Sequence, residues 1–339
     1  MLSPLPSSPD AFVRLRLDLA YDGTDFAGWA PQPALRTVGG ELSAALTTLL
    51  RQRDPVRVTV AGRTDAGVHA SGQVVHIDVP EAALAALPGR SARTPEAALV
   101  TRLGGILTRD VVVRSVTRAP AGFDARFSAL ERRYRYRLAD PEAVRDPLRR
   151  GDTVWWRRPL DVDAMNRSSL ALEGLGDFAA FCKRREGATT IRTLIEFSWC
   201  RLPDGVLEAT VRADAFCHSM VRSLVGAALR VGEGKRGPDW PAMLQRDGVR
   251  GGSGGERGGG GALVVPAHGL SLREVVYPAD SELAGRSQEA RARRQASQLG
   301  RQVDPAVHQA VAPVLDPGFD PVLDPGAAST TVGEATVSL

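Results

Sequence analysis

Alternation of apolar and polar side chains marks the first readable segment of the chain. Residues 12–20, FVRLRLDLA, carry apolar side chains at every odd position from 13 to 19 and charged ones between them, which predicts a half-buried strand. Residues 37–52 instead space their apolar side chains at helical intervals, with Thr37 as candidate N-cap and Glu41 in the first turn. Further strands are expected at 56–60, 73–79 and 110–118, and a further helix at 94–107. This β-α-β-β-α-β order predicts a ferredoxin-like module, an antiparallel sheet with helices on one face.

The second half of the chain repeats this order. Helical spacing covers 161–175 and 215–232. Strands are expected at 130–138, 191–200, 205–213 and 270–278, with a short extra strand near 153–157. The sequence therefore predicts an α+β fold of two ferredoxin-like modules in tandem, with a cleft between them.

Segments without periodic apolar positions bound these modules. Residues 1–11 and 279–339 are expected to be disordered, because neither carries an apolar face that could pack. The N-terminal module is placed at 12–118 and the C-terminal module at 119–278. A glycine-rich stretch, 246–262, lacks the Gly-Lys-Ser/Thr ending of a phosphate loop and is predicted to be a flexible insertion.

Composition narrows the class of partner without fixing it. The 339 residues carry a formal net charge of +4, which permits a polyanionic partner. Only Lys183 and Lys235 among the 43 basic residues are lysines, and the others are arginines. Arginine suits phosphate contacts and base stacking. A GC-rich genome would produce the same excess of arginine over lysine. No run of about 18 apolar residues predicts a membrane span. Residues 1–11 lack the pattern of a secretory signal, so a cytoplasmic protein is expected.

The three cysteines, Cys182, Cys200 and Cys217, lie far apart and form no Cys-x-x-Cys pair. Neither a disulfide framework nor a zinc site is expected from this spacing. They are interpreted as small apolar core residues.

A glycine-bounded string, GRTDAGVHA at 62–70, holds the first candidate chemistry. Asp65 stands two residues from Arg63 in a segment too polar for a core strand or helix. One interpretation is a turn in which the Asp side chain caps nearby backbone N–H groups. The other is a nucleophile or base beside a cation that handles phosphate.

Four further strings accompany this motif: YDGTDFAGW (21–29), FDARFSALERRYRY (123–136), AFCHSMVR (215–222) and PAHGLSL (266–272). In this order, with AGRTDAGVHA and GQVVHID, they resemble the TruA family of tRNA pseudouridine synthases over about residues 12 to 278. The resemblance implies an isomerase that converts uridine to pseudouridine at positions 38, 39 and 40 of the tRNA anticodon stem-loop. It also implies a homodimer without cofactor or metal, and a positively charged cleft between the modules that holds tRNA.

The resemblance assigns roles to individual residues. Uracil must detach from C1′ at N1, rotate and rejoin at C5, and Asp65 matches the family's catalytic carboxylate, assigned as the nucleophile of this reaction. Attack at C1′, attack at C6 and assistance of glycosidic cleavage through a glycal intermediate all remain open. The target base must leave the stack, and Arg63 would fill the vacated space or grip a phosphate. Tyr134 would stack on the flipped uracil and help to remove the C5 proton, Arg222 would pair with Asp65, and Leu270 would pack on the base.

Other residues are placed less specifically. Tyr136 shares the strand face of Tyr134 and could be core. His69 is expected to support its loop or contact RNA, and neither His69 nor His218 is assigned as a base. Phosphate contacts are expected from further arginines, which are Arg126, Arg132, Arg133 and Arg135.

Alternatives remain at this point. An Asp-nucleophile phosphatase would need a second carboxylate at short spacing, which RTDAG does not offer. A non-catalytic RNA-binding module could stack bases on Tyr134 but gives no role to Asp65. A third alternative is a related synthase that modifies another tRNA position, and the sequence alone distinguishes this alternative least well from a TruA enzyme. Departures from the family pattern at Ala30, Gly39 and 83–94 put details of RNA contact in doubt, not the reaction.

Overall fold

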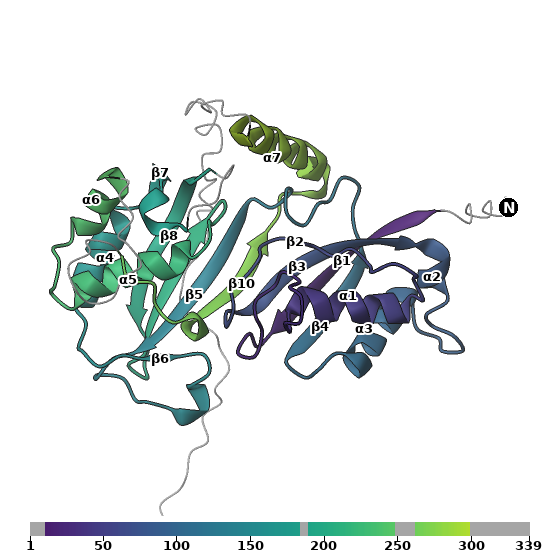
Figure 1. The fold of residues 1–339 in the computed structure, drawn as a ribbon, viewed down its shortest axis with the longest axis horizontal. Coiled ribbons are helices and arrows are strands. Elements are labelled where there is room, and N and C mark those ends of the chain that lie inside the picture. The colour runs from purple at the N-terminus through teal and green to yellow at the C-terminus, as the bar shows by residue number, and fades with distance from the viewer. Residues whose placement is uncertain (1–10, 184–188, 248–261, 299–339) are drawn as a thin grey trace, which may run out of the picture. The chain divides into compact units, whose positions relative to one another are not determined.

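The computed structural model describes residues 11–183, 189–247 and 262–298 of the chain. These residues fall within one structural unit, Met1–Gln302. They form a mixed α+β structure around one ten-stranded sheet, most of it antiparallel, with the strand order β4-β1-β3-β10-β5-β9-β8-β7 (Figure 1). Two short strands lie off this path: β2 pairs with β3, and β6 pairs with β5.

The first half of the described chain contributes one end of the sheet. Its strands and helices are β1 (Phe12–Tyr21), α1 (Val38–Leu49), β2 (Thr59–Val60), β3 (His69–Pro80), α2 (Glu81–Ala85), α3 (Pro95–Ile106) and β4 (Val111–Arg118). Strand β1 pairs antiparallel with both β3 and β4. The alternation in β1 has the predicted effect, because Leu15, Leu17 and Leu19 are buried. Thr37 is the N-cap of α1, where its side chain accepts a hydrogen bond from Gly40 N–H.

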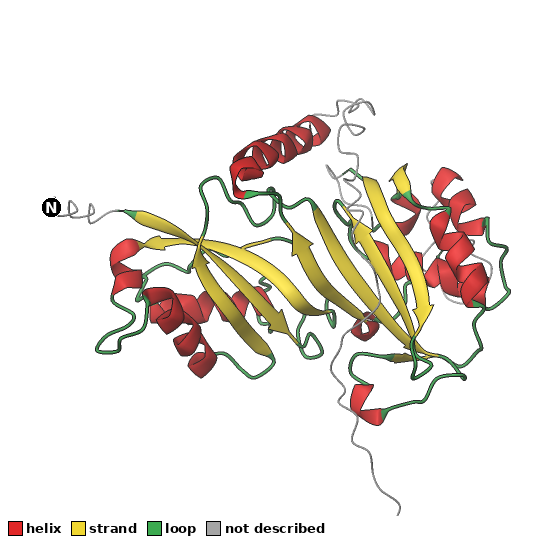
Figure 2. Cartoon of the chain, turned by 180° about the vertical axis from the view of Figure 1, so that it is seen from behind, coloured by secondary structure: helices red, strands yellow, loops and turns green. Residues whose placement is uncertain are grey.

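The second half contributes the other end. Its elements are β5 (Glu131–Ala139), β6 (Val154–Trp155), α4 (Val162–Leu170), β7 (Gly174–Asp177), β8 (Ile191–Arg201), β9 (Leu207–Ala213), α5 (Met220–Gly232), α6 (Trp240–Asp247), β10 (Leu270–Val276) and α7 (Leu283–Gln298). Single turns of 3-10 helix lie at Pro147–Arg149, Ala179–Phe181, Ala267–Gly269 and Asp280–Glu282. Helices α1 and α3 lie against the first half of the sheet, and α4, α5 and α6 against the second half (Figure 2).

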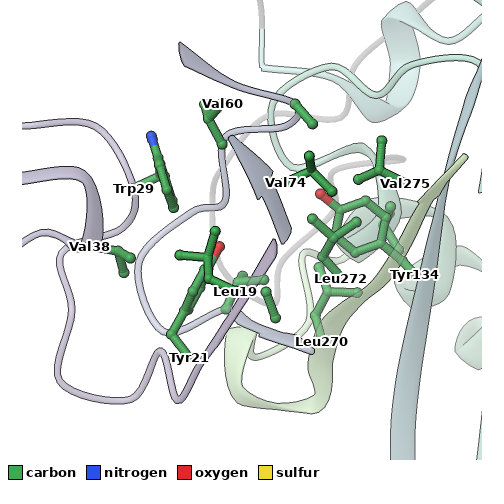
Figure 3. Packing of buried hydrophobic residues seen from close by; sticks show 14 of the residues in the cluster. Leu19, Tyr21, Trp29, Val38, Val60, Val74, Tyr134, Leu270, Leu272 and Val275 are labelled. Carbon is green, nitrogen blue, oxygen red and sulfur yellow. The ribbon is translucent and has the colours of Figure 1, made fainter. Parts of the chain in front are cut away.

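Strand β10 joins the two halves. It pairs parallel with β3, where Ser271 faces His69, and antiparallel with β5, where Leu270 faces Tyr136. Buried side chains from both halves meet in one apolar cluster across this seam (Figure 3). Strand β10 therefore holds β3, the strand that follows the Asp65 loop, against β5 and the second half of the sheet.

Several element boundaries differ from the sequence expectation. The helix expected at 161–175 ends at Leu170, because the chain turns into β7, where Gly174 has a φ of 102°. The helix expected at 215–232 begins only at Met220. Strand β7 and helix α6 were not predicted.

Part of the expected C-terminal tail is helical, so the prediction of disorder from 279 is wrong for Leu283–Gln298. Helix α7 docks through buried Leu283 and through Arg291, whose guanidinium lies 2.5 Å from the buried Asp124 carboxylate. The helix has few apolar residues, and its anchors come from residues about 160 positions away, which sequence periodicity does not reveal. The expectations for 1–10, 248–261 and 299–339 fall outside the described residues.

The cysteine expectation is also wrong in part. Cys182 and Cys217 form a disulfide, whereas Cys200 is exposed and free. The two bonded residues are 35 positions apart, and only the fold brings the end of the Ala179–Phe181 turn against the turn that precedes α5. Within the described ranges, no helix is long and apolar enough to cross a membrane.

Candidate active site

The loop between β2 and β3 is held by the segment 21–29. Trp29 N–H donates to Thr64 O at 3.1 Å, and Gly67 N–H donates to Phe26 O at 3.2 Å. The Tyr21 hydroxyl lies 2.8 Å from Thr64 Oγ1 in a buried hydrogen bond. This approach needs small residues: a Cβ on Gly23 would lie 2.1 Å from Val68 O. The string YDGTDFAGW therefore acts as the cradle of the loop that carries Asp65.

The Asp65 side chain does not cap its own turn. Among the described residues, its carboxylate has partners only from the segment before and within α5. His218 Nε2 lies 3.3 Å from Oδ1, Ser219 Oγ donates to Oδ2 at 3.4 Å, and Arg222 Nη1 lies 3.9 Å from Oδ2. The carboxylate thus faces a cation and two polar donors from the second half of the chain, which the capping interpretation does not explain.

The start of α5 is shaped to present these groups. Ser219 occupies the N-cap position with a φ of 64°, a left-handed conformation that a non-glycine residue seldom adopts. Its hydroxyl makes no capping bond to the helix and turns to Asp65 instead. Arg222 is oriented by Val265, whose carbonyl accepts from Nε at 2.7 Å. This arrangement gives up about 1 kcal/mol of N-cap stabilisation to place a hydroxyl beside the carboxylate.

Tyr134 lies at the same place, on the helix-covered face of β5. Its ring is buried and meets the Phe216 ring edge-on, with centroids 5.1 Å apart. Burial raises the pKa of Tyr134 far above its usual value, and the negative charge of Asp65 adds to this. The phenol therefore stays protonated near neutral pH. Its hydroxyl makes no hydrogen bond to any residue the structure describes.

Tyr136 and Leu270 belong to the core beside this site. Tyr136 is fully buried and donates from its hydroxyl to Pro266 O at 3.1 Å. Leu270 is buried at the start of β10, next to Leu272 and Tyr134 (Figure 3). The sequence spacing predicts both tyrosines on one face of β5. Among the described residues, only the Tyr136 hydroxyl has a hydrogen-bond partner.

His69 has the contacts of a loop-supporting residue. It is buried, its Nδ1 accepts from Gly23 N–H at 3.0 Å, and its Nε2 lies 3.0 Å from the carbonyl oxygens of Gly151 and His268. The ring thus connects the cradle, the 62–70 loop and the HGL turn.

The expected RNA-contacting arginines divide into three environments. Arg63 is exposed and makes no ion pair or hydrogen bond within the described part of the chain, and Arg126 is exposed with its guanidinium over the Phe127 ring. Arg133 and Arg135 alternate to the face of β5 opposite Tyr134, where they lie 3.2 Å from Glu274 and 3.6 Å from Glu208. Arg132 is buried, so its guanidinium is not available to RNA, contrary to the sequence expectation.

No group of three or more His, Cys, Asp or Glu side chains suited to a metal ion occurs among the described residues. The groups gathered at Asp65 are one guanidinium, one phenol and the polar donors of the α5 turn.

Comparison with known proteins places the chain in a family. The family model described as tRNA pseudouridine synthase matches residues 169–278. Curated proteins named tRNA pseudouridine synthase A are 54% identical over 84% of this chain and 96% of the Frankia casuarinae protein, and 55% identical over 84% of this chain and 94% of the Streptomyces avermitilis protein. The chain belongs to the tRNA pseudouridine synthase A family. A protein of this name from Mycobacterium leprae is 50% identical over 81% of the chain and 93% of its own length.

For this member of the tRNA pseudouridine synthase A family, sequence reasoning missed two of the groups that contact Asp65. His218 and Ser219 lie in the AFCHSMVR string, and the helix predicted there points their two side chains along different faces. In the structure the helix begins only at Met220, after Ser219. A lone polar pair ahead of an apolar run was the available signal of an N-terminal turn.

Proposed function

We propose that the protein isomerises uridine to pseudouridine at positions 38, 39 and 40 of the tRNA anticodon stem-loop, with Asp65 as nucleophile. Family membership supports the reaction class. The observation that carries the assignment of the nucleophile is the position of the Asp65 carboxylate, on a loop of one half and facing Arg222 and His218 of the other.

The reaction needs little beyond these groups. The N1–C1′ bond breaks, a C5–C1′ bond forms, and the proton on C5 is lost while N1 gains one, so atoms and electrons balance without a redox partner. Arg222 and the donors of the α5 turn face the Asp65 carboxylate and orient it for attack. Any bond that the Asp65 carboxylate forms with the nucleoside breaks again within the cycle, so the carboxylate is regenerated for the next turnover.

Tyr134 is proposed to stack on the uracil that has left the helix. Because its pKa is raised by burial, a phenolate base is disfavoured at neutral pH. The neutral hydroxyl, without a protein partner among the described residues, can instead donate a hydrogen bond to the base or the sugar. Leu270, beside it in the core, is proposed to pack on the other side of the base.

The RNA is proposed to enter past Arg63 and Arg126. Both guanidinium groups are exposed, and Arg63 is two residues from Asp65. The strand orders β4-β1-β3-β2 and β10-β5-β9-β8 support a description as two ferredoxin-like modules, with Asp65 from one and Tyr134 from the other. A homodimer in the cytoplasm is proposed from the family resemblance.

The function is tested by mapping pseudouridine in the tRNA of a strain that lacks this protein. We expect pseudouridine to be lost at positions 38, 39 and 40 and at no other position, and to return when the gene is restored. Loss of pseudouridine at a different position would support the isomerase activity but contradict the proposed target positions. An unchanged pattern of pseudouridine in the tRNA would contradict the proposal.

A further inference from the structure

Arg132 is a buried arginine with no carboxylate partner among the described residues. It lies on the same face of β5 as Tyr134 and is only 8% exposed. Its guanidinium donates to three backbone carbonyls: Asp214 O at 2.6 Å, Arg126 O at 2.7 Å and Ala61 O at 2.9 Å. Burial lowers its pKa below the usual arginine value, yet a guanidinium remains charged at any physiological pH.

Placing this charge in the interior is costly, because the guanidinium leaves water without gaining an ion pair. An apolar side chain of similar length would fill the same space without that cost. What only arginine supplies is a planar fork of five donors, which can bind several carbonyls from different segments at fixed angles.

The three carbonyls come from the segments that build the site. Ala61 opens the loop that carries Asp65, four residues later. Asp214 directly follows β9 and opens the segment that leads to α5, four residues before His218 and eight before Arg222. Arg126 belongs to the connection between β4 and β5, ahead of Tyr134.

We propose that Arg132 is a positioning residue that sets the distance between the Asp65 loop and the turn carrying His218, Ser219 and Arg222. The inference rests on the proposed function, in that it concerns the same carboxylate. Arg132 then positions these segments through its hydrogen bonds to their backbone carbonyls, and it contacts neither RNA nor the reacting atoms. Its three hydrogen bonds explain how two halves of the chain hold one carboxylate in register.

The next residue provides a matched control. Arg133 has the same side chain in the same strand, but it points to the opposite face and pairs with Glu274 at 3.2 Å near the surface. A change at Arg133 alters the charge of the strand equally and leaves the three carbonyl bonds in place. The sequence suggested Arg133 as a phosphate contact, but its side chain pairs with Glu274 on the face opposite Tyr134, so the proposed RNA path past Arg63 and Arg126 does not include it.

The experiment compares Arg132→Lys and Arg132→Met with Arg133→Lys and Arg133→Met in the full chain. Single-turnover pseudouridine formation, the Kd for tRNA and its salt dependence are measured for each. Lysine keeps the charge but cannot reach three carbonyls, so we expect both Arg132 variants to lose at least about thirtyfold in rate. We expect their tRNA Kd and salt slope to stay within about threefold of wild type, and both Arg133 variants to keep a rate within about threefold.

Hydrogen exchange provides a readout that needs no turnover. The amides of Ala61, Gly67 and Val68 are hydrogen-bonded within or around the loop. We expect peptides covering 59–69 and 214–222 to exchange at least about fivefold faster in Arg132→Lys than in Arg133→Lys, with α1 and α3 unchanged. This comparison decides the positioning role even if the wild type makes no pseudouridine, an outcome that would contradict the proposed function alone.

Three results would overturn the inference. Weaker tRNA binding with a shallower salt slope at unchanged single-turnover rate would make Arg132 an RNA contact. Wild-type rate and exchange in both Arg132 variants would remove any positioning role. Global unfolding of both variants would make Arg132 a general core residue.

Discussion

The two segments that meet at Asp65 are built in different ways. The 62–70 loop is held by backbone hydrogen bonds to the cradle at 21–29, with glycines where the chains approach closely. The 215–222 segment is held by side chains: the Cys182–Cys217 disulfide, the Arg222 bond to Val265 O and a left-handed Ser219. The nucleophile thus comes from a loop held mainly by main-chain contacts, and the groups that face it come from a turn held mainly by side-chain contacts.

The largest effect should follow from removing the charge of Asp65 on the 62–70 loop. Asp65→Asn keeps the shape of the side chain but loses the nucleophile, so we expect pseudouridine formation to fall at least about a thousandfold, or about 4 kcal/mol of barrier. Tritium release from C5 of uridine in tRNA measures the rate. Binding of tRNA should stay within about tenfold, because Asp65 is not a phosphate contact; an unfolded variant would restore the interpretation of Asp65 as a structural turn residue.

In the 215–222 segment, Arg222→Met should cost about a hundredfold in rate. The change removes the guanidinium that faces Asp65 and leaves a side chain of similar length, so the carboxylate loses a positively charged neighbour that orients it. The same tritium assay, run as a single turnover at saturating tRNA, measures the rate. A rate within threefold of wild type would mean that the 3.9 Å separation is too long to matter.

Tyr134 distinguishes stacking from proton transfer. Tyr134→Phe keeps the ring that packs on Phe216, so we expect a loss of about tenfold or less and an unchanged pH profile between pH 7 and 9. The sign follows from the raised pKa of Tyr134: the phenol is already protonated throughout this range, so no phenolate is lost. Tyr134→Ala should cost far more, and equal effects of both variants would contradict a stacking role.

A smaller effect on the rate is expected from changes at His218. We expect its N–H group beside Asp65 to matter more than the rest of the imidazole ring. Glutamine can present an amide N–H to Asp65 Oδ1 and leucine cannot, so His218→Gln should stay within about threefold of wild type while His218→Leu falls about tenfold. Single-turnover rates at one pH decide this. Equal loss in both variants would show that the imidazole does more than donate one hydrogen bond.

The smallest effect on activity should come from the C-terminus. Removing 299–339 should change neither stability nor rate. Removing 279–339 deletes α7 with its Leu283 and Arg291 contacts, and should lower the free energy of unfolding by about 1–2 kcal/mol while the rate at 25 °C stays within threefold. Thermal unfolding of the two truncations, measured side by side, separates these outcomes.

The sequence predicts those parts of the fold and the site that depend on local contacts, and it misses those that depend on contacts between distant segments. Alternation in β1 and the Thr37 cap reveal their elements because the decisive contacts are local. The RTD string and Tyr134 are found because the motifs are distinctive, and the structure brings both into one region. The contact of Ser219 with Asp65, the Cys182–Cys217 bond and the burial of Arg132 are not visible in the sequence, because each depends on residues from distant segments that only the fold brings together.

The role of Asp65 is tested most directly by restoring the gene in a strain that lacks it, once as wild type and once as Asp65→Asn, and mapping pseudouridine in the tRNA. The wild-type gene should restore pseudouridine at positions 38, 39 and 40, and the Asp65→Asn gene should restore none at equal protein level. Restoration of pseudouridine by the Asn variant would contradict the assignment of Asp65 as the nucleophile.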